Sequence, residues 1–223
     1  EPRGFRPVPP REDVEWFAPV AANIAAALAV DGSWFVNICP GAEGRQRRRY
    51  VLDLVISHFD AGWLFLDEYA YPAGMMPLDP KQIGRFKHGF EMIYGFSRST
   101  QYKFRPDDVR HESDGAFTYG GVDARISHDY QGDKELTKRT AMQKVGKGLA
   151  YPSTFLKIGK DRALGHAAAF PVGLPEFFIK AYTDEGDAVF DPFVGSGSSL
   201  IACERTGRAG FGMDISAAYC DVS

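Results

Sequence analysis

The sequence predicts an α/β fold in which strands alternate with helices around one sheet. Three observations lead to this prediction. Apolar residues recur at helical spacing in several segments. Short apolar runs, rich in β-branched and aromatic residues, separate these segments and are typical of buried strands. Near the carboxyl end, a predicted strand is followed by a turn with two glycines and a helix. Alternation of this kind predicts a parallel sheet with helices on both faces.

The predicted elements fall into two ordered regions with an irregular one between them. The first helix begins at Glu12, where helical spacing starts, and stops at Asp31–Gly32. The other predicted helices are 48–59, 174–183 and 198–207. The predicted strands are 33–38, 62–71, 89–97, 187–193 and 209–216.

Periodicity is lost from Ser99 to about Gly148, where charge, glycine and tyrosine dominate. We interpret this stretch as an insertion or recognition lobe. The predicted domain organisation is therefore one half of the main domain at 1–98, an irregular region at 99–150 and the second half at 151–223.

The composition limits the classes of function. With 223 residues, of which 44% are hydrophobic, the chain can bury one sizeable core. Twenty-six basic residues against 29 acidic ones give a formal charge of -3, which excludes a polybasic protein that binds nucleic acid by bulk charge. Any contact with nucleic acid must come from local basic patches.

The cysteines and histidines indicate neither disulfides nor a metal. Three widely spaced cysteines, Cys39, Cys203 and Cys220, form no C-x-x-C pair, so a reducing cytoplasm fits best. The five histidines show no metal-ligand spacing. No apolar run reaches the roughly 18 residues that span a bilayer, and we expect a soluble protein without a membrane partner.

The most informative motif is DPFVGSGSS, which starts at Asp191. It lies between a predicted strand and a predicted helix, where backbone N–H groups can approach a nucleotide-like ligand. Gly195 and Gly197 permit the tight turn. About twenty residues further on, Asp214 ends the next strand, where a carboxylate can accept hydrogen bonds from ribose hydroxyls. These features predict an adenosine-binding half-site, whereas a dinucleotide oxidoreductase would need a third glycine at Leu200.

The motif resembles a specific family. DPFVGSGSS followed by ACERTGRAGFGMDISAAYC is similar to the cofactor segment of DNA amino-methyltransferases. Upstream, HAAAFPVGLPEFFIKAYTDEGD resembles the permuted, beta-type subgroup, and within it the cytosine-N4 methyltransferases of the PvuII type. The resemblance is sharp from Tyr151 to Tyr219. It implies a Rossmann-like, S-adenosylmethionine-dependent methyltransferase sheet, with the irregular region as a small target-recognition insertion.

The resemblance also implies roles for individual residues. The loop around the methionine end of S-adenosylmethionine would comprise Asp191, Pro192, Phe193, Gly195, Ser196, Gly197 and Ser198. Asp214 would bind the ribose and Ile215 would lie beside the adenine. Phe170 and Pro171 would close the pocket. The product would be S-adenosylhomocysteine, and no metal is implied. Ser198–Ser199 replaces the usual Thr-Thr of the family.

The catalytic motif of the family is not visible in this sequence. The family uses a [DNS]-P-P-[YFW] loop that accepts the hydrogens of the base amine and stacks on the flipped base. Here the only Pro-Pro pair, Pro9–Pro10, is preceded by Val8 and followed by Arg11, so it can fill neither role. We expect the loop upstream of Glu12, and we assign no catalytic residue.

Basic residues predict contacts with double-stranded DNA. Arg45 to Arg49 form a concentrated positive run, and a second group mixes cations with aromatic residues, as backbone contact and stacking require. The predicted DNA-binding residues are Arg45, Arg47, Arg48, Arg49, Lys87, Arg98, Lys103, Lys134, Lys138 and Arg139.

The expected activity is site-specific methylation of an exocyclic base amine after base flipping, with cytosine N4 favoured. The alternatives are an adenine-N6 methyltransferase of the same fold, a catalytically inactive DNA-binding relative, and a small-molecule methyltransferase. A cognate restriction endonuclease is a further expected partner, and the expected setting is the cytoplasm of a prokaryote, with the gene on a bacterial or phage genome.

Overall fold

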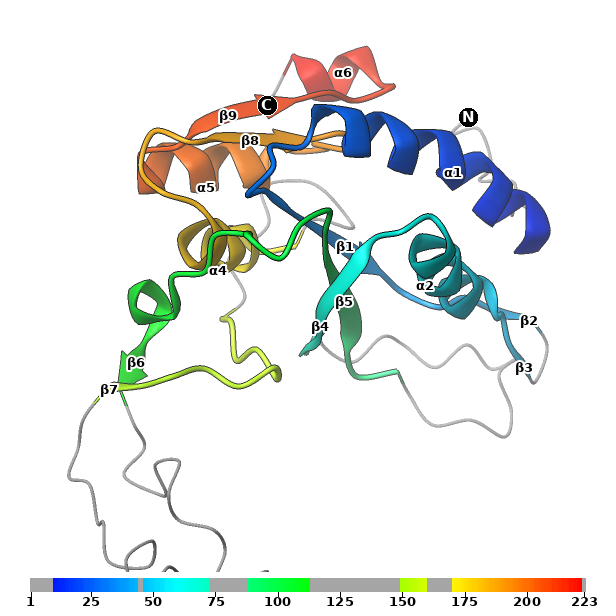
Figure 1. The fold of residues 1–223 in the computed structure, drawn as a ribbon, viewed down its shortest axis with the longest axis horizontal. Helices are drawn as coiled ribbons and strands as arrows, with labels where there is room; N and C mark the ends of the chain where they lie inside the picture. Colours follow the sequence, from blue (N-terminus) through cyan, green and yellow to red (C-terminus); the bar gives the residue numbers. More distant parts are fainter. Residues whose placement is uncertain (1–9, 44–45, 73–87, 113–148, 160–169, 222–223) are drawn as a thin grey trace, which may run out of the picture. The chain divides into compact units, whose positions relative to one another are not determined.

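The computed structural model describes residues 10–43, 46–72, 88–112, 149–159 and 170–221 (Figure 1). The chain forms two compact units, of which the first comprises Glu1–Arg105 and Ser153–Ser223 and the second Pro106–Pro152. The irregular region predicted at 99–150 overlaps the second unit. The predicted division into three parts stays a prediction.

The larger sheet of the first unit has the strand order β1-β5-β4. β5 (Glu91–Ser97) lies between β1 (Ser33–Ile38) and β4 (Leu64–Tyr71) and is antiparallel to both. β1 and β4 therefore run in the same direction, as expected for two strands joined through a helix, here α2 (Tyr50–Asp60). The prediction of a parallel sheet was wrong for these three strands, because β5 lies between β1 and β4 and runs in the opposite direction.

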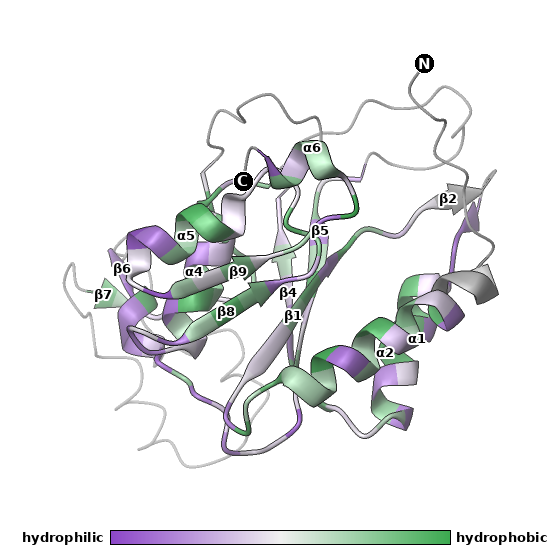
Figure 2. Ribbon diagram, turned by 90° about the horizontal axis from the view of Figure 1, so that it is seen from above, coloured by the Kyte–Doolittle hydropathy of each residue, from purple (hydrophilic) through white to green (hydrophobic). Residues whose placement is uncertain are grey.

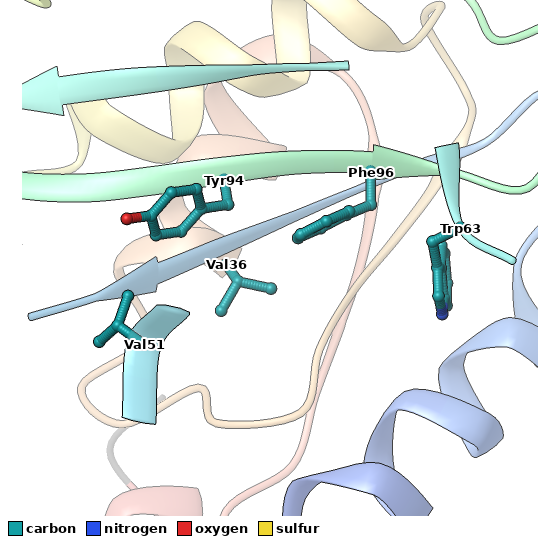
Figure 3. Packing of buried hydrophobic residues seen from close by; sticks show 5 residues of the cluster. All are labelled: Val36, Val51, Trp63, Tyr94 and Phe96. Carbon is teal, nitrogen blue, oxygen red and sulfur yellow. The ribbon is translucent and has the colours of Figure 1, made fainter. Parts of the chain in front are cut away.

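One face of this sheet packs on α1 (Pro10–Ala27) and α2. Alternate residues of a strand point to opposite faces, and Val36 of β1 joins Val51 of α2, Trp63, Tyr94 and Phe96 in a buried cluster (Figure 3). Phe17 and Ile24 of α1, and Leu28 directly after it, pack against this cluster, as expected from the helical spacing of apolar residues in this segment.

The opposite face packs on α4 (Gly173–Tyr182). Phe35, the neighbour of Val36 on β1, points the other way, and its ring stacks 4.4 Å from that of Phe178. The hydroxyls of Tyr69 and Tyr182 form a buried hydrogen bond of 2.7 Å. Helices thus cover both faces of this sheet, which confirms the predicted α/β layering.

A second sheet in the same unit pairs β8 (Ala188–Asp191) with β9 (Ala209–Gly212) in parallel. α5 (Ser198–Thr206) joins the two strands, and Val189 packs on the buried cluster of Ile179, Ala202 and Cys203. Figure 2 shows hydrophobic residues along both strands. This β8-α5-β9 segment is the strand–turn–helix–strand unit that the sequence predicted. A short helix, α6 (Ala217–Cys220), follows it.

Two short antiparallel strand pairs complete the described elements. β2 (Ala42–Glu43) pairs antiparallel with β3 (Gln46–Arg47) in the first unit. In the second unit, the 3-10 helix η1 (Pro106–Val109) precedes β6 (His111–Glu112), which pairs antiparallel with β7 (Leu149–Ala150). Residues 99–105 of the predicted recognition lobe belong to the first unit, and its residues 113–148 lie outside the described part of the chain. Among the helices that the structure describes, none has the length and apolarity needed to cross a bilayer.

His58 is a buried polar residue in the aromatic core. Its side chain is 3% exposed, and its ring lies 4.6 Å from the ring of Phe96 and 5.2 Å from that of Trp34. Nδ1 lies 2.7 Å from the carbonyl of Leu54, while Nε2 is buried and finds no hydrogen-bond partner among the described residues. Burial therefore lowers the pKa of His58 below its ordinary value, since a proton on Nε2 would place an uncompensated charge among aromatic rings.

We expect the stability of the protein to fall as the pH drops through about 6.5, the ordinary histidine pKa. The folded state holds His58 neutral, so the unfolded chain takes up the proton first and is favoured at lower pH. Urea unfolding between pH 5 and 8 should show this slope, and H58F should flatten it. Exposed His111, substituted by glutamine, is the control. Equal slopes for H58F and the wild type would contradict the assignment.

Candidate cofactor site

The site is built around the turn between β8 and α5. Gly195 and Gly197 have φ values of +52° and +82°, a left-handed backbone that residues with a Cβ adopt only at a cost. The N–H of Gly197 donates to the carbonyl of Val194 at 2.9 Å, and the carbonyl of Gly197 accepts from Ile201 at 3.0 Å. The glycines therefore turn the chain directly from the strand into α5.

Asp191 holds the two sides of this turn together. One carboxylate oxygen accepts a hydrogen bond of 2.9 Å from the N–H of Phe193, and the other accepts one from the hydroxyl of Ser199 in the first turn of α5. Because both oxygens are used inside the turn, the direct role of Asp191 in the structure is to shape the loop. The sequence did not single out Ser199 as its partner.

Asp214 connects the loop to the residues that follow β9. Its carboxylate accepts hydrogen bonds from the N–H of Gly195 at 3.1 Å and the N–H of Ser216 at 2.8 Å. A carboxylate has about four acceptor positions, and Asp214 is only partly buried, so it can still accept bonds from hydroxyls of a ligand. The structure brings Asp214 and the glycine turn together, as the sequence-based half-site requires.

Close backbone packing fixes the position of the loop on β9. A Cβ on Gly212 would lie 2.7 Å from Cγ2 and 2.8 Å from Cβ of Val194. The backbone adds two bonds of 3.0 Å, one from Met213 to Asp191 and one from Val194 to Met213. β9 can therefore approach this closely only because residue 212 has no side chain.

Phe170 and Pro171, the residues predicted to close the pocket, lie beside the loop and the start of α4. The hydroxyl of Ser198 donates to the carbonyl of Phe170 at 3.1 Å. Pro171 is buried, and its carbonyl accepts a bond of 2.9 Å from the N–H of Leu174 at the start of α4. Phe170 and Pro171 are thus tied to the first turns of α5 and α4.

The remaining predicted cofactor residues are accessible. Phe193 is 51% exposed and Ile215 is fully exposed. Pro192 and Ser196 are half-buried. The loop combines a backbone fixed by hydrogen bonds, a carboxylate with acceptor positions left, and exposed apolar side chains. Small-molecule sites typically combine apolar surface with a few placed polar groups in this way.

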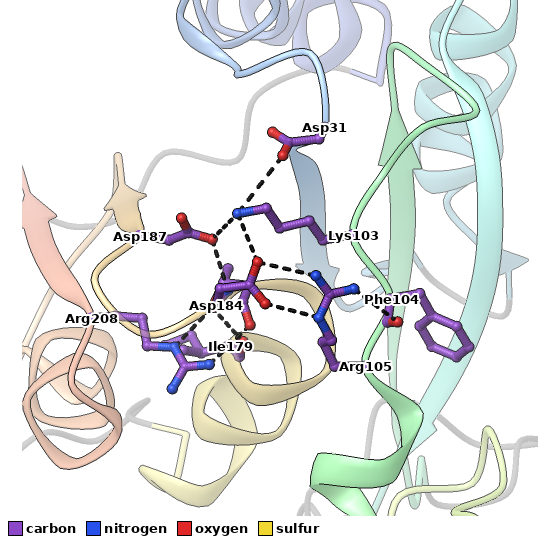
Figure 4. A network of polar contacts seen from close by, with 9 residues as sticks. Asp31, Lys103, Phe104, Arg105, Ile179, Asp184, Asp187 and Arg208 are labelled. Atoms are coloured by element: carbon purple, nitrogen blue, oxygen red, sulfur yellow. Dashed lines mark hydrogen bonds and ion pairs between the residues drawn. The ribbon is translucent and has the colours of Figure 1, made fainter.

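A polar network surrounds Asp187, which directly precedes β8, at the end of the strand opposite to the loop. Nζ of Lys103 lies 2.6 Å from Asp187, 3.1 Å from Asp184 and 3.7 Å from Asp31 (Figure 4). Arg105 adds a bidentate pair with Asp184. Hydrogen bonds from Arg105 and Lys103 hold the pKa of Asp184 below its ordinary value, and Lys103 has the same effect on the pKa of Asp187.

Four of the predicted DNA-binding residues make contacts within the protein. Arg49 forms hydrogen bonds with Asp53, and Lys103 occupies the network just described. Arg98 donates to the carbonyl of Ala61 and lies over the ring of Trp63. Arg47 bonds the carbonyl of Pro40 and contacts His88.

The other six candidates are Arg48, which is partly buried, and five residues outside the described part of the chain. Arg48 is half-buried beside the β2–β3 pair. The predictions for Arg45, Lys87, Lys134, Lys138 and Arg139 lie outside the described residues. The assignment of these cations to DNA stays a prediction.

Sequence reasoning overlooked Trp16. Its ring centroid lies 6.1 Å from that of Phe193 in the loop, although it belongs to α1. The available indication was its position: Phe17 lies on the apolar stripe of the helix, and Trp16 is a large aromatic residue one position off that stripe. Within the described ranges, no group of three or more histidine, cysteine or acidic residues could hold a metal ion.

The fold is a Rossmann-like α/β domain, in which a glycine turn after β8 is bonded to an aspartate that follows β9. Residues 10–223 match the family model described as DNA methylase, with the short name N6_N4_Mtase. The chain therefore belongs to the N6/N4 DNA methylase family.

Individual relatives agree with the family. The type II methyltransferase M.PvuII of Proteus hauseri is 26% identical in a match that covers 95% of this chain and 69% of that protein. The orphan methyltransferase M.BamHII of Bacillus amyloliquefaciens is 43% identical over 61 residues, 27% of this chain and 23% of the relative. Across the first three curated relatives, the matches cover only 7% to 23% of their lengths.

Solved structures share the fold. PvuII DNA methyltransferase, described as cytosine-N4-specific, has a TM-score of 0.69 at 20% identity, over 98% of this chain and 72% of that one. TTHA0409 of Thermus thermophilus, solved in complex with S-adenosyl-L-methionine, has a TM-score of 0.60 at 18% identity, over 94% and 74%. These likenesses confirm the predicted Rossmann-like methyltransferase fold.

Proposed function

We propose that this chain is the cofactor-binding part of a DNA methyltransferase that transfers a methyl group from S-adenosylmethionine to an exocyclic base amine, with cytosine N4 favoured. The observation that carries the proposal is the bond from the N–H of Gly195 to Asp214. It joins the glycine turn and the acidic strand end, two parts of the adenosine-type half-site that lie 19 residues apart.

The residues present fit this cofactor by their chemistry. Asp214 keeps acceptor positions for the ribose hydroxyls, and exposed Ile215 offers an apolar surface to the adenine. The turn at 195–198 presents polar backbone to the methionine end, and Phe193 adds an exposed ring. S-adenosylmethionine supplies an electrophilic methyl group, and these residues bind and orient its carrier.

We propose that the catalytic loop is supplied by a segment other than the residues of this sequence. The amine nitrogen of a base is a weak nucleophile because its lone pair is delocalised into the ring. Acceptors for its hydrogens are therefore needed, and the only Pro-Pro pair here lacks the flanking residues that would provide them.

Double-stranded DNA is the proposed macromolecular substrate. Among the described cations, Arg47 on the β2–β3 pair is exposed. Its side chain contacts the carbonyl of Pro40 and the ring of His88 rather than a carboxylate, so neither contact cancels its positive charge. We favour this pair, with its arginine run, as the phosphate contact. A cognate restriction endonuclease and action in a prokaryotic cytoplasm remain parts of the proposal.

Mass spectrometry of nucleosides from treated plasmid DNA tests the proposed chemistry. The 223-residue chain should leave the DNA unmodified, because it lacks the acceptor loop, while the full gene product should produce N4-methylcytosine. N6-methyladenine would overturn the choice of base. Absence of both products with the full gene product would indicate the inactive relative, and methylation by this chain alone would refute the proposal of a separate catalytic segment.

A further inference from the structure

Trp16 is an exposed aromatic residue in an unusual position. It is 61% exposed, whereas Trp63 is buried and Trp34 packs on the buried core. Successive residues of a helix lie about 100° apart around its axis. Because Phe17 is held against Trp34, with stacked rings 5.8 Å apart, the preceding residue is directed out of that core.

The outward side chain of Trp16 meets the cofactor loop. Its ring lies 6.1 Å from the ring of Phe193, with the planes tilted by 38°. The N–H of Phe193 is fixed by Asp191 at 2.9 Å, but this bond does not fix its side chain. Among the described residues, Trp16 provides the ring contact of Phe193.

Both rings remain more than half exposed, at 61% and 51%. Two adjacent rings with this much accessible surface contribute little to the folded core, and they gain burial when a ligand covers them. They also lie at the loop whose Gly195 N–H is bound by the partly accessible carboxylate of Asp214. A contact of this kind can orient a binding residue without itself being needed for folding.

We propose that Trp16 is a positioning residue for the cofactor site, which holds the ring of Phe193 in place and couples helix α1 to occupancy of the loop. This inference rests on the proposed function. Tilted aromatic pairs are worth about 0.5–1.5 kcal/mol, which corresponds to a change in affinity of about twofold to tenfold.

Calorimetric titration with S-adenosylhomocysteine tests the inference. W16A should weaken binding by about twofold to tenfold, and W16F should restore affinity close to that of the wild type because it keeps a ring. The matched control is F59A, which removes a 52% exposed ring from α2 that contacts Phe65 rather than the loop. Thermal unfolding of each variant without ligand separates loss of fold from loss of binding.

Tryptophan emission provides a second readout that a purely structural role would not change. S-adenosylhomocysteine should alter the emission of the wild type, and the change should disappear in W16F, since Trp34 and Trp63 lie in the core. Unchanged affinity in folded W16A, or an emission change that persists in W16F, would overturn the inference and leave the proposed function intact. A wild-type protein that binds no S-adenosylhomocysteine would remove both.

Discussion

Substitution of Asp214 by asparagine is expected to lower the affinity for S-adenosylhomocysteine by about a hundredfold. The carboxylate accepts bonds from the N–H groups of Gly195 and Ser216, and an amide can accept only at its single oxygen. One N–H would then face an NH₂ group. Hydrogen bonds to charged groups contribute about 1.5–3 kcal/mol each, and loss of the proposed ribose contact would add to this effect.

Calorimetry of D214N alongside D221N measures this effect. Asp221 is exposed and lies just beyond α6, so D221N makes the same change of charge without touching the loop. D221N should bind as the wild type does. Equal affinities for D214N and D221N would show that Asp214 does not organise the site.

Gly212→Ala is the second substitution with a large expected effect. Its new Cβ would lie 2.7 Å from the side chain of Val194, and Val194 is buried, so the residue next to Gly195 must move. Overpacking of this kind costs about 1–3 kcal/mol of folding stability. We also expect at least about a tenfold loss of affinity, since the displaced backbone belongs to the proposed cofactor site.

Gly159→Ala is the matched control for Gly212→Ala, because no atom of the described residues lies within 4 Å of a Cβ at that position. Urea unfolding and calorimetry of both variants separate stability from binding. If Gly212→Ala retained wild-type stability and affinity, the close packing of β9 on the loop would have no functional importance.

Much of the fold could be predicted because local patterning agrees with the tertiary structure. Val36 and Phe35 are neighbours on β1 and pack on opposite helical layers, which a buried apolar strand allows. The direction of β5 could not be predicted from alternation. Strand order and direction depend on partners distant in sequence, such as the pairing of Ile93 with Asn37 and Tyr69, and no local pattern specifies them.

In the site, too, features set by local sequence could be predicted and contacts between distant elements could not. The glycine turn could be predicted because it requires left-handed backbone, and Asp214 because it follows the next strand closely, although β9 ends at Gly212 rather than at the predicted position. The roles of Ser199 and Trp16 could not, since each depends on a contact between different elements. The cations were predicted from clustering and from their mixing with aromatic residues. The structure shows Lys103 among three carboxylates, a pairing that sequence spacing does not reveal.

Isothermal titration of the folded 223-residue chain with S-adenosylhomocysteine is the decisive measurement for the cofactor site. We predict saturable binding with one molecule per chain, strongly weakened in D214N and unchanged in D221N. A folded wild-type chain that releases or absorbs no heat of binding, and whose unfolding temperature does not change with the ligand, would contradict the assignment of the loop to S-adenosylmethionine.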